Sequence, residues 1–182
     1  MIYLDNRRTM FKLDTPHDTT VFRNFEIIDP SIIEDIVEDE TVKREHYGFD
    51  YRYTDRNTPT IDFAQNIASN FLDMFNYNHN QKVWYMDVIR YNLNDNKPID
   101  SGLAWHCEND NYPNLITVLM YPKVDEGVND GGLGYIDSCG VSQTIMIESG
   151  TIIIMDGRVI HKPLKPFGVG KRDTIAVSFE KY

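Results

Sequence analysis

The triplet His106-Cys107-Glu108 combines residue types and a spacing that could bind a metal ion. Along a β-strand, residues i and i+2 point to the same face, so the His106 imidazole and the Glu108 carboxylate would converge while Cys107 points away. An imidazole and a carboxylate are two of the three ligands in the two-histidine, one-carboxylate sets that bind divalent metals. By itself the triplet is a weak signal, because a chain with 28 acidic residues often has an acid two positions after a histidine by chance.

Two later residues give this triplet a context. His161 follows an apolar run and a tight turn, and Arg172 opens the last long β-rich run. On a strand, Arg172, Thr174 and Ala176 would share one face. The other histidines have no acid two positions later and are interpreted as surface or loop residues: His17, His46 and His79.

Short β-rich runs alternate with turn signals from residue 83 to the end of the sequence. The runs cover residues 83–91, 103–108, 115–121, 132–137, 143–147, 151–155 and 172–179. Short strands at this spacing are typical of a β-sandwich or barrel. We therefore predict an α+β, mainly β, fold: a double-stranded β-helix of the jelly-roll or cupin-like type, with buttressing helices from the N-terminal half.

The first 80 residues mix strand and helix signals. Residues 19–29 predict a strand, and Pro30 after a capping Asp29 predicts a helix over residues 30–37. A second helix follows Pro59, because apolar residues recur there in steps of three and four and would form one buried stripe. That stripe consists of Ile61, Ala64, Ala68, Phe71, Leu72 and Phe75.

Length, charge and cysteine content restrict the class of protein. The 182 residues indicate a single domain, residues 1–182. The net charge of −10 argues against nonspecific nucleic-acid binding and fits a peptide or small-molecule substrate better. Two cysteines do not make a disulfide framework, so we expect free thiols and a cytoplasmic location. The sequence contains neither an apolar run that could span a membrane nor a signal-peptide pattern, and it leaves the oligomeric state open.

The order of motifs from Val83 to Tyr182 resembles the catalytic core of the iron(II)/2-oxoglutarate dioxygenases, most closely their prolyl-hydroxylase-like branch. That branch has a strand ending in Tyr, a His-x-acid motif, a Thr-rich strand ending in Tyr, a Gly-Gly pair, a Gly before an apolar strand, a distal His, and a basic residue about ten positions later. The corresponding residues are Val88–Tyr91, His106–Glu108, Thr117–Tyr121, Gly131-Gly132, Gly150–Ile154, His161 and Lys171-Arg172. The resemblance implies that residues 81–182 form the catalytic core. Residues 1–80 lie outside the resemblance, and their mixed strand and helix signals predict a region that supports the sheet.

The resemblance also implies an iron(II) site formed by His106, Glu108 and His161. The acid is Glu here, where the family usually has Asp. On the open side of the metal, the co-substrate 2-oxoglutarate and dioxygen would bind. The polar stretch of residues 92–102 before the triplet is interpreted as a lid over the substrate.

A permanently charged group must bind the far carboxylate of 2-oxoglutarate. Arg172 suits this role, because a guanidinium stays protonated and binds carboxylate in a fork. Lys171 would take its place if the strand slipped by one residue. The hydroxyls of Tyr121 and Thr174, and more weakly that of Tyr91, are expected to bind the same carboxylate.

The activity implied by the resemblance is hydroxylation of an unactivated C–H bond, coupled to the conversion of 2-oxoglutarate to succinate and carbon dioxide. A peptidyl proline is the first substrate expectation. Three alternatives stay open: a hydroxylase of a free amino acid or small metabolite, a nucleic-acid oxidase, and a non-catalytic jelly-roll or cupin-like metal-binding module. The acidic charge of the chain argues against the nucleic-acid oxidase.

Overall fold

The computed structural model describes residues 8–25, 29, 44–45, 51–53, 59–81, 83–94, 104–108, 114–129 and 131–182. The helix predicted over residues 30–37 lies outside this part of the chain, and so does most of the lid predicted over residues 92–102. Both therefore stay predictions. Within the described residues, no helix is long and apolar enough to cross a membrane.

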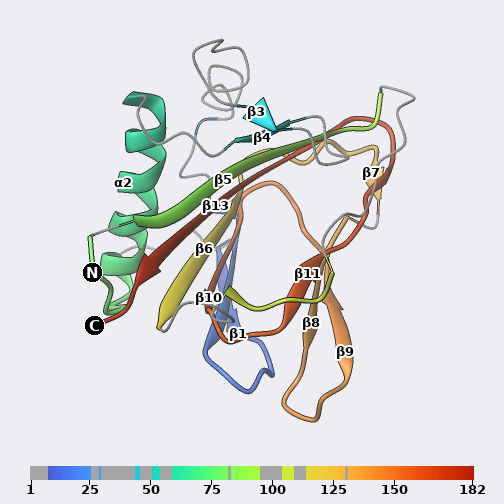
Figure 1. The fold of residues 1–182 in the computed structure, drawn as a ribbon. Coiled ribbons are helices and arrows are strands. Elements are labelled where there is room, and N and C mark those ends of the chain that lie inside the picture. Colours follow the sequence, from blue (N-terminus) through green and yellow to red (C-terminus); the bar gives the residue numbers. More distant parts are fainter. Residues whose placement is uncertain are drawn as a thin grey trace.

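Most of the regular secondary structure in the described residues consists of antiparallel strands (Figure 1). They are β1 (Thr9–Lys12), β2 (Thr19–Arg23), β3 (Arg44–Glu45), β4 (Tyr51–Tyr53), β5 (Val83–Asn92), β6 (Leu115–Tyr121), β7 (Val128–Asn129), β8 (Leu133–Ile136), β9 (Ser142–Ile145), β10 (Thr151–Asp156), β11 (His161–Pro163), β12 (Phe167–Gly168) and β13 (Lys171–Glu180). The described helix is α2 (Pro59–Met74). Eight strands form one large sheet in the order β1-β2-β10-β6-β13-β5-β4-β3, three form a small sheet in the order β11-β8-β9, and β12 pairs with β7.

One face of the large sheet packs against the small sheet. A core cluster joins Val21, Leu119 and Ile153 of the large sheet to Leu133 and Ile145 of the small sheet. Two antiparallel sheets closed over a shared core in this way form a double-stranded β-helix, so the predicted fold class is confirmed.

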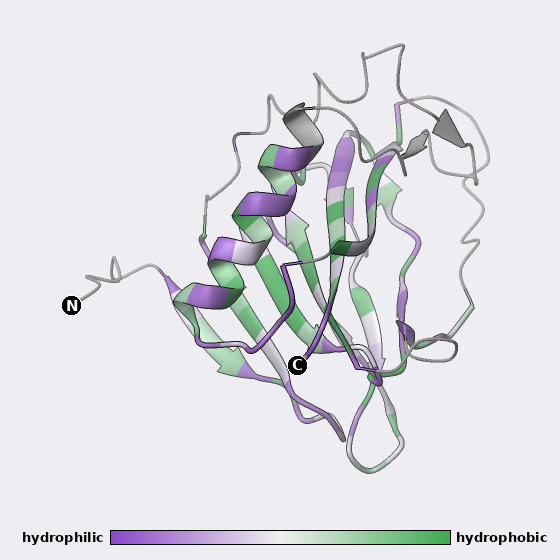
Figure 2. Cartoon of the chain, turned by 60° about the vertical axis from the view of Figure 1, so that its left-hand side comes forward, coloured by the Kyte–Doolittle hydropathy of each residue, from purple (hydrophilic) through white to green (hydrophobic). Residues whose placement is uncertain are grey.

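Helix α2 covers the opposite face of the large sheet. Its hydrophobic side is turned toward the strands and its hydrophilic side outward (Figure 2). Ala64, Ala68, Phe71 and Leu72 are buried there, which confirms that part of the predicted stripe. Aromatic rings pack between the helix and the sheet: the ring centroid of Phe22 on β2 lies 4.9 Å from that of Phe71 on α2.

Strand β13 lies in the middle of the large sheet and is buried on both faces. Because side chains alternate along a strand, Ile175, Val177 and Phe179 join the cluster under the helix. The intervening residues face the interior between the two sheets, where Ala176 joins the second cluster. The same alternation in β5 and β6 lines this interior with side chains from three neighbouring strands.

The strand predicted over residues 19–29 is too long. Strand β2 ends at Arg23, because Asn24 adopts the left-handed backbone conformation with a φ of 60° and cannot continue a ladder. The sequence also did not predict the short strands β1, β3, β4, β7, β11 and β12. Strands of two to four residues carry too little periodicity to be recognised.

Candidate metal centre

A backbone bridge between two distant segments holds His106 beside His161. Each residue donates its backbone N–H to the carbonyl of the other, at 3.0 and 2.9 Å, and the ring centroids lie 4.5 Å apart. His161 is the first residue of β11. The strand predicted over residues 103–108 is wrong for residues 104–108, which form only this isolated bridge and a short turn.

Both imidazoles are oriented by backbone carbonyls. The Nδ1 of His106 lies 2.9 Å from the Ala104 carbonyl oxygen, and the Nδ1 of His161 lies 3.0 Å from the Val159 carbonyl oxygen. Since a carbonyl only accepts hydrogen bonds, Nδ1 carries the proton in each ring and the Nε2 lone pair is left for a ligand. Histidine ligands in metal sites are held by such second contacts.

Burial keeps the His161 imidazole neutral. Burial, together with a smaller contribution from the neighbouring His106, lowers the pKa of His161 to about 4. A neutral imidazole is the form that binds metal, so His161 is in its metal-binding form at neutral pH.

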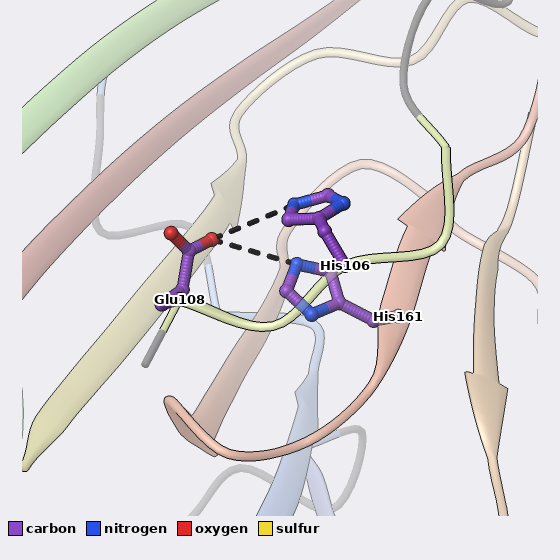
Figure 3. Close-up of side chains that lie close together, drawn as sticks. All are labelled: His106, Glu108 and His161. Carbon is purple, nitrogen blue, oxygen red and sulfur yellow. Dashed lines mark ion pairs between the residues drawn. The ribbon is translucent and has the colours of Figure 1, made fainter. Parts of the chain in front are cut away.

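Glu108 completes a three-residue cluster (Figure 3). Its Oε1 lies 3.6 Å from the Nε2 of His161 and 3.8 Å from the Nε2 of His106. The three potential ligand atoms all lie within 4.8 Å of one another. Metal–ligand bonds of about 2.0–2.2 Å require such atoms to lie within roughly 4.4 Å, so a small contraction suffices. Two imidazoles and one carboxylate on one side of a cavity fit iron(II), and also its divalent neighbours manganese and zinc.

The cluster opens into a pocket of about 320 Å³ between the two sheets. All seven residues singled out from the sequence line it: His106, Glu108, His161, Arg172, Tyr121, Thr174 and Tyr91. The remaining lining residues are Tyr85, Asp87, Ile89, Leu119, Leu133, Pro163 and Ala176. The structure therefore brings the predicted metal ligands and the predicted carboxylate-binding residues to one cavity.

Arg172 is a buried cation without a carboxylate partner among the described residues. Only 2% of it is exposed, its Nε has no hydrogen-bond partner, and its Nη1 makes one long bond of 3.4 Å to the Leu164 carbonyl oxygen. Its guanidinium lies 4.4 Å from the ring centroid of Tyr91, its cross-strand neighbour on β5. A buried donor of this kind fits an anionic ligand, since leaving the charge unpaired is costly.

Lys171, the sequence alternative to Arg172, does not line the pocket. Its backbone N–H donates to the Asp125 carboxylate at 2.8 Å, which ties the start of β13 to the segment after β6. The alternation along β13 therefore turns Arg172, and not Lys171, toward the cavity.

Two tyrosine hydroxyls near Arg172 stay protonated. Burial raises the pKa of Tyr121 to about 12, against the opposing effect of the Arg172 charge. Burial, with a smaller contribution from Tyr121, likewise raises the pKa of Tyr91 to about 12 against the opposing effect of Arg172. Both hydroxyls can therefore donate a hydrogen bond to an anion at neutral pH.

Sequence reasoning missed three residues that shape the pocket. Tyr85 and Asp87 lie at even spacings from Tyr91 on β5, so the period-two pattern would have placed them on the same face. Gly131 entered the sequence analysis only as part of the Gly-Gly pair. A Cβ built on it would lie 2.5 Å from the Nη1 of Arg172, so this glycine leaves room for the guanidinium.

Solved structures share this fold. An oxidoreductase of the 2OG-Fe(II) oxygenase family from Burkholderia pseudomallei matches with a TM-score of 0.62 and 14% identity over 90% of this chain and 84% of that chain. HygX from Streptomyces hygroscopicus, with nickel, 2-oxoglutarate and hygromycin B bound, matches with a TM-score of 0.58 and 14% identity over 90% and 82%. A prolyl-4-hydroxylase from Pseudomonas putida matches with a TM-score of 0.56 and 10% identity over 92% and 94%.

The chain has the fold of the iron(II)- and 2-oxoglutarate-dependent oxygenases. No protein-family model and no curated protein sequence matches it. The similarity to this oxygenase fold is thus one of three-dimensional structure, and the chemistry has to be argued from the residues of the pocket.

Proposed function

We propose that this chain is an iron(II)- and 2-oxoglutarate-dependent oxygenase that hydroxylates an unactivated C–H bond. One observation carries the proposal: a single pocket contains both the cluster of His106, Glu108 and His161 and the buried guanidinium of Arg172. A module that only binds metal needs the three-residue cluster but not the buried guanidinium. The guanidinium is expected where an anionic co-substrate binds beside the metal, because a buried cation needs a counter-charge.

The cluster of His106, Glu108 and His161 would hold the iron(II) ion through two imidazole nitrogens and a carboxylate oxygen. When bound, iron supplies the redox chemistry by which 2-oxoglutarate and dioxygen yield succinate and carbon dioxide while one oxygen atom enters a substrate C–H bond. The protein contributes orientation and exclusion of water. The apolar side chains of Ile89 and Leu119 line the pocket and limit the access of water.

Arg172 binds the far carboxylate of 2-oxoglutarate in this proposal. The Tyr121 hydroxyl and the Thr174 hydroxyl add donors from β6 and from β13 itself. Tyr91 holds the guanidinium in place through its ring. Because the binding group in this proposal is a guanidinium, the binding of this carboxylate does not depend on the protonation of a lysine or histidine.

The decisive experiment is an anaerobic titration of 2-oxoglutarate into protein loaded with iron(II). Chelation of iron by the keto acid gives a weak visible absorption band, so a saturable band is the expected result. Iron binding without any band would contradict the proposal and would favour the cupin-like metal-binding module. Apo-protein with the same amount of 2-oxoglutarate is the control.

A peptidyl proline is the first substrate that we propose. The order of motifs is that of the prolyl-hydroxylase-like branch, and a prolyl-4-hydroxylase from Pseudomonas putida has the same fold. Succinate formation with a proline-rich peptide, compared with the same peptide containing alanine in place of proline, tests this substrate. Equal turnover of the two peptides would rule it out.

A small polar molecule is the second candidate, and Asp87 favours it. This carboxylate is buried and lines the pocket from β5, where it could bind an ammonium or hydroxyl group that a prolyl ring lacks. HygX, which has the same fold, was crystallised with hygromycin B. Free proline, hygromycin B and a methylated oligonucleotide complete the panel of test compounds, and the oligonucleotide is expected to give no succinate above background.

A further inference from the structure

Tyr85 lines the pocket, and its hydroxyl reaches the cluster of His106, Glu108 and His161. It donates a hydrogen bond to the Oε1 of Glu108 across 3.2 Å. Tyr85 lies on β5, which pairs with the central strand β13 of the large sheet, and its cross-strand neighbour there is Ser178. Ser178 is buried and hydrogen-bonded to Thr117 at 2.8 Å. The hydroxyl therefore projects from a strand that is paired within the large sheet.

The contacted oxygen is the one that faces the histidines. Oε1 of Glu108 lies 3.6 Å from the Nε2 of His161 and 3.8 Å from the Nε2 of His106. Glu108 itself lies in no strand but in the short turn that follows the His106 bridge. Its side chain has one more rotatable bond than that of an aspartate, so its carboxylate needs an anchor to stay in one orientation. Tyr85 provides such an anchor.

We propose that Tyr85 is a positioning residue that fixes the Glu108 carboxylate for metal binding, and that its reach suits a glutamate and not an aspartate at position 108. This inference rests on the metal site of the proposed function. A hydroxyl that donates to one lone pair of the carboxylate oxygen leaves the other lone pair for the metal. Outer partners of this kind typically contribute 10–100-fold to metal affinity.

The test is a double-mutant cycle with manganese(II), which binds the same types of ligand and allows affinity to be measured without turnover. Binding is followed by the loss of the electron paramagnetic resonance signal of free manganese(II). The variants are Tyr85→Phe, Glu108→Asp and the double variant. Tyr77→Phe is the matched control, because it also removes a hydrogen-bonded hydroxyl, the one bound to Thr20, away from the pocket.

We expect Tyr85→Phe to raise the dissociation constant of manganese(II) by about tenfold and Tyr77→Phe to leave it unchanged. In the Glu108→Asp background, Tyr85→Phe should have no further effect, because the shorter carboxylate no longer meets the hydroxyl. Melting temperatures of the metal-free variants check that the fold is intact. Tight binding by the unaltered chain with no change in Tyr85→Phe overturns the positioning role alone.

An equal loss of affinity from Tyr85→Phe in both backgrounds also overturns the positioning role, since Tyr85 would then act through packing. Absence of manganese(II) binding by the unaltered chain overturns the positioning role and the metal site together. The visible band with iron(II) and 2-oxoglutarate is a separate measurement. A failure of the oxygenase proposal is thereby distinguished from a failure of the Tyr85 proposal.

Discussion

The two ends of the pocket are built in different ways. The arginine end, formed by Arg172, Tyr91, Tyr121 and Thr174, stands on regular paired strands of the large sheet, where Arg172 and Tyr91 are direct cross-strand partners. The histidine end, formed by His106, Glu108 and His161, combines a histidine at the start of β11 with an isolated bridge at His106 and a Glu108 carboxylate outside any strand.

This difference shows that strand pairing alone can orient the side chains of the arginine end, whereas those of the histidine end need additional hydrogen bonds. The side-chain direction of a residue in a central strand is fixed by the hydrogen-bonded strands on both sides. At the histidine end only His161 lies in a paired strand. His106 and Glu108 are held by individual hydrogen bonds: the reciprocal bridge, the bond between the His106 ring and a carbonyl, and the Tyr85 bond. Each bond at that end should therefore matter more to metal binding than a bond of similar length elsewhere.

The largest expected effect is at the histidine end. His161→Ala removes a buried ligand and should weaken the binding of iron(II) or manganese(II) by at least about 100-fold, with loss of the visible band. Metal affinity measured anaerobically checks this prediction. His17→Ala, which changes a histidine outside the pocket, should bind metal normally. Retention of normal affinity in His161→Ala would mean that the cluster is not the metal site.

At the arginine end, Arg172→Met should raise the dissociation constant of 2-oxoglutarate by about 100-fold, because it removes the only buried cation of the described pocket lining. Metal affinity should stay within about twofold, since this cation does not touch the metal ligands. Lys171→Met is the matched control, one residue along the strand and outside the pocket. A larger loss in Lys171→Met than in Arg172→Met would reverse the assignment of the two residues.

A smaller effect at the same end is expected from Gly131→Ala. The added methyl group would lie 2.5 Å from the Nη1 of Arg172 and 2.8 Å from Pro166, so the guanidinium must shift. We expect 2-oxoglutarate to bind about three- to tenfold more weakly, with unchanged metal affinity. Gly132→Ala is the contrast, because its methyl group would meet the backbone oxygen of Ile145 at 2.5 Å and should lower the melting temperature instead. Unchanged 2-oxoglutarate affinity in Gly131→Ala would show that the Arg172 guanidinium can shift without loss of binding.

The smallest effect is a dependence of stability on alkaline pH. In the folded chain the pKa of Tyr121 is about 12, whereas an unfolded tyrosine ionises near 10, so the folded state keeps its proton longer. The free energy of unfolding should therefore fall as the pH rises from about 10 toward 12, because only the unfolded state has lost the proton. Tyr121→Phe should reduce this slope, as measured by denaturant unfolding at several pH values. A slope identical to that of the unaltered chain would show that Tyr121 ionises as readily when folded.

Much of the fold could be predicted because apolar alternation is strong in the central strands. The predicted runs 83–91, 115–121 and 172–179 match β5, β6 and β13 within two residues, and the run 151–155 matches β10 within one. The strand prediction failed where the local backbone conformation did not follow the apolar alternation of the sequence. Asn24 ends β2 early, and residues 104–108 form a bridge where a strand was expected.

Sequence alone determined which side chains share a face. The period-two rule places Arg172, Thr174 and Ala176 on one side of β13, and all three line the pocket. Only the tertiary structure decided which distant groups meet. The bridge between His106 and His161, the bond from Tyr85 to Glu108 and the space that Gly131 leaves for Arg172 all join segments far apart in the chain. Such contacts depend on how the two sheets close on each other, and no local periodicity encodes that closure.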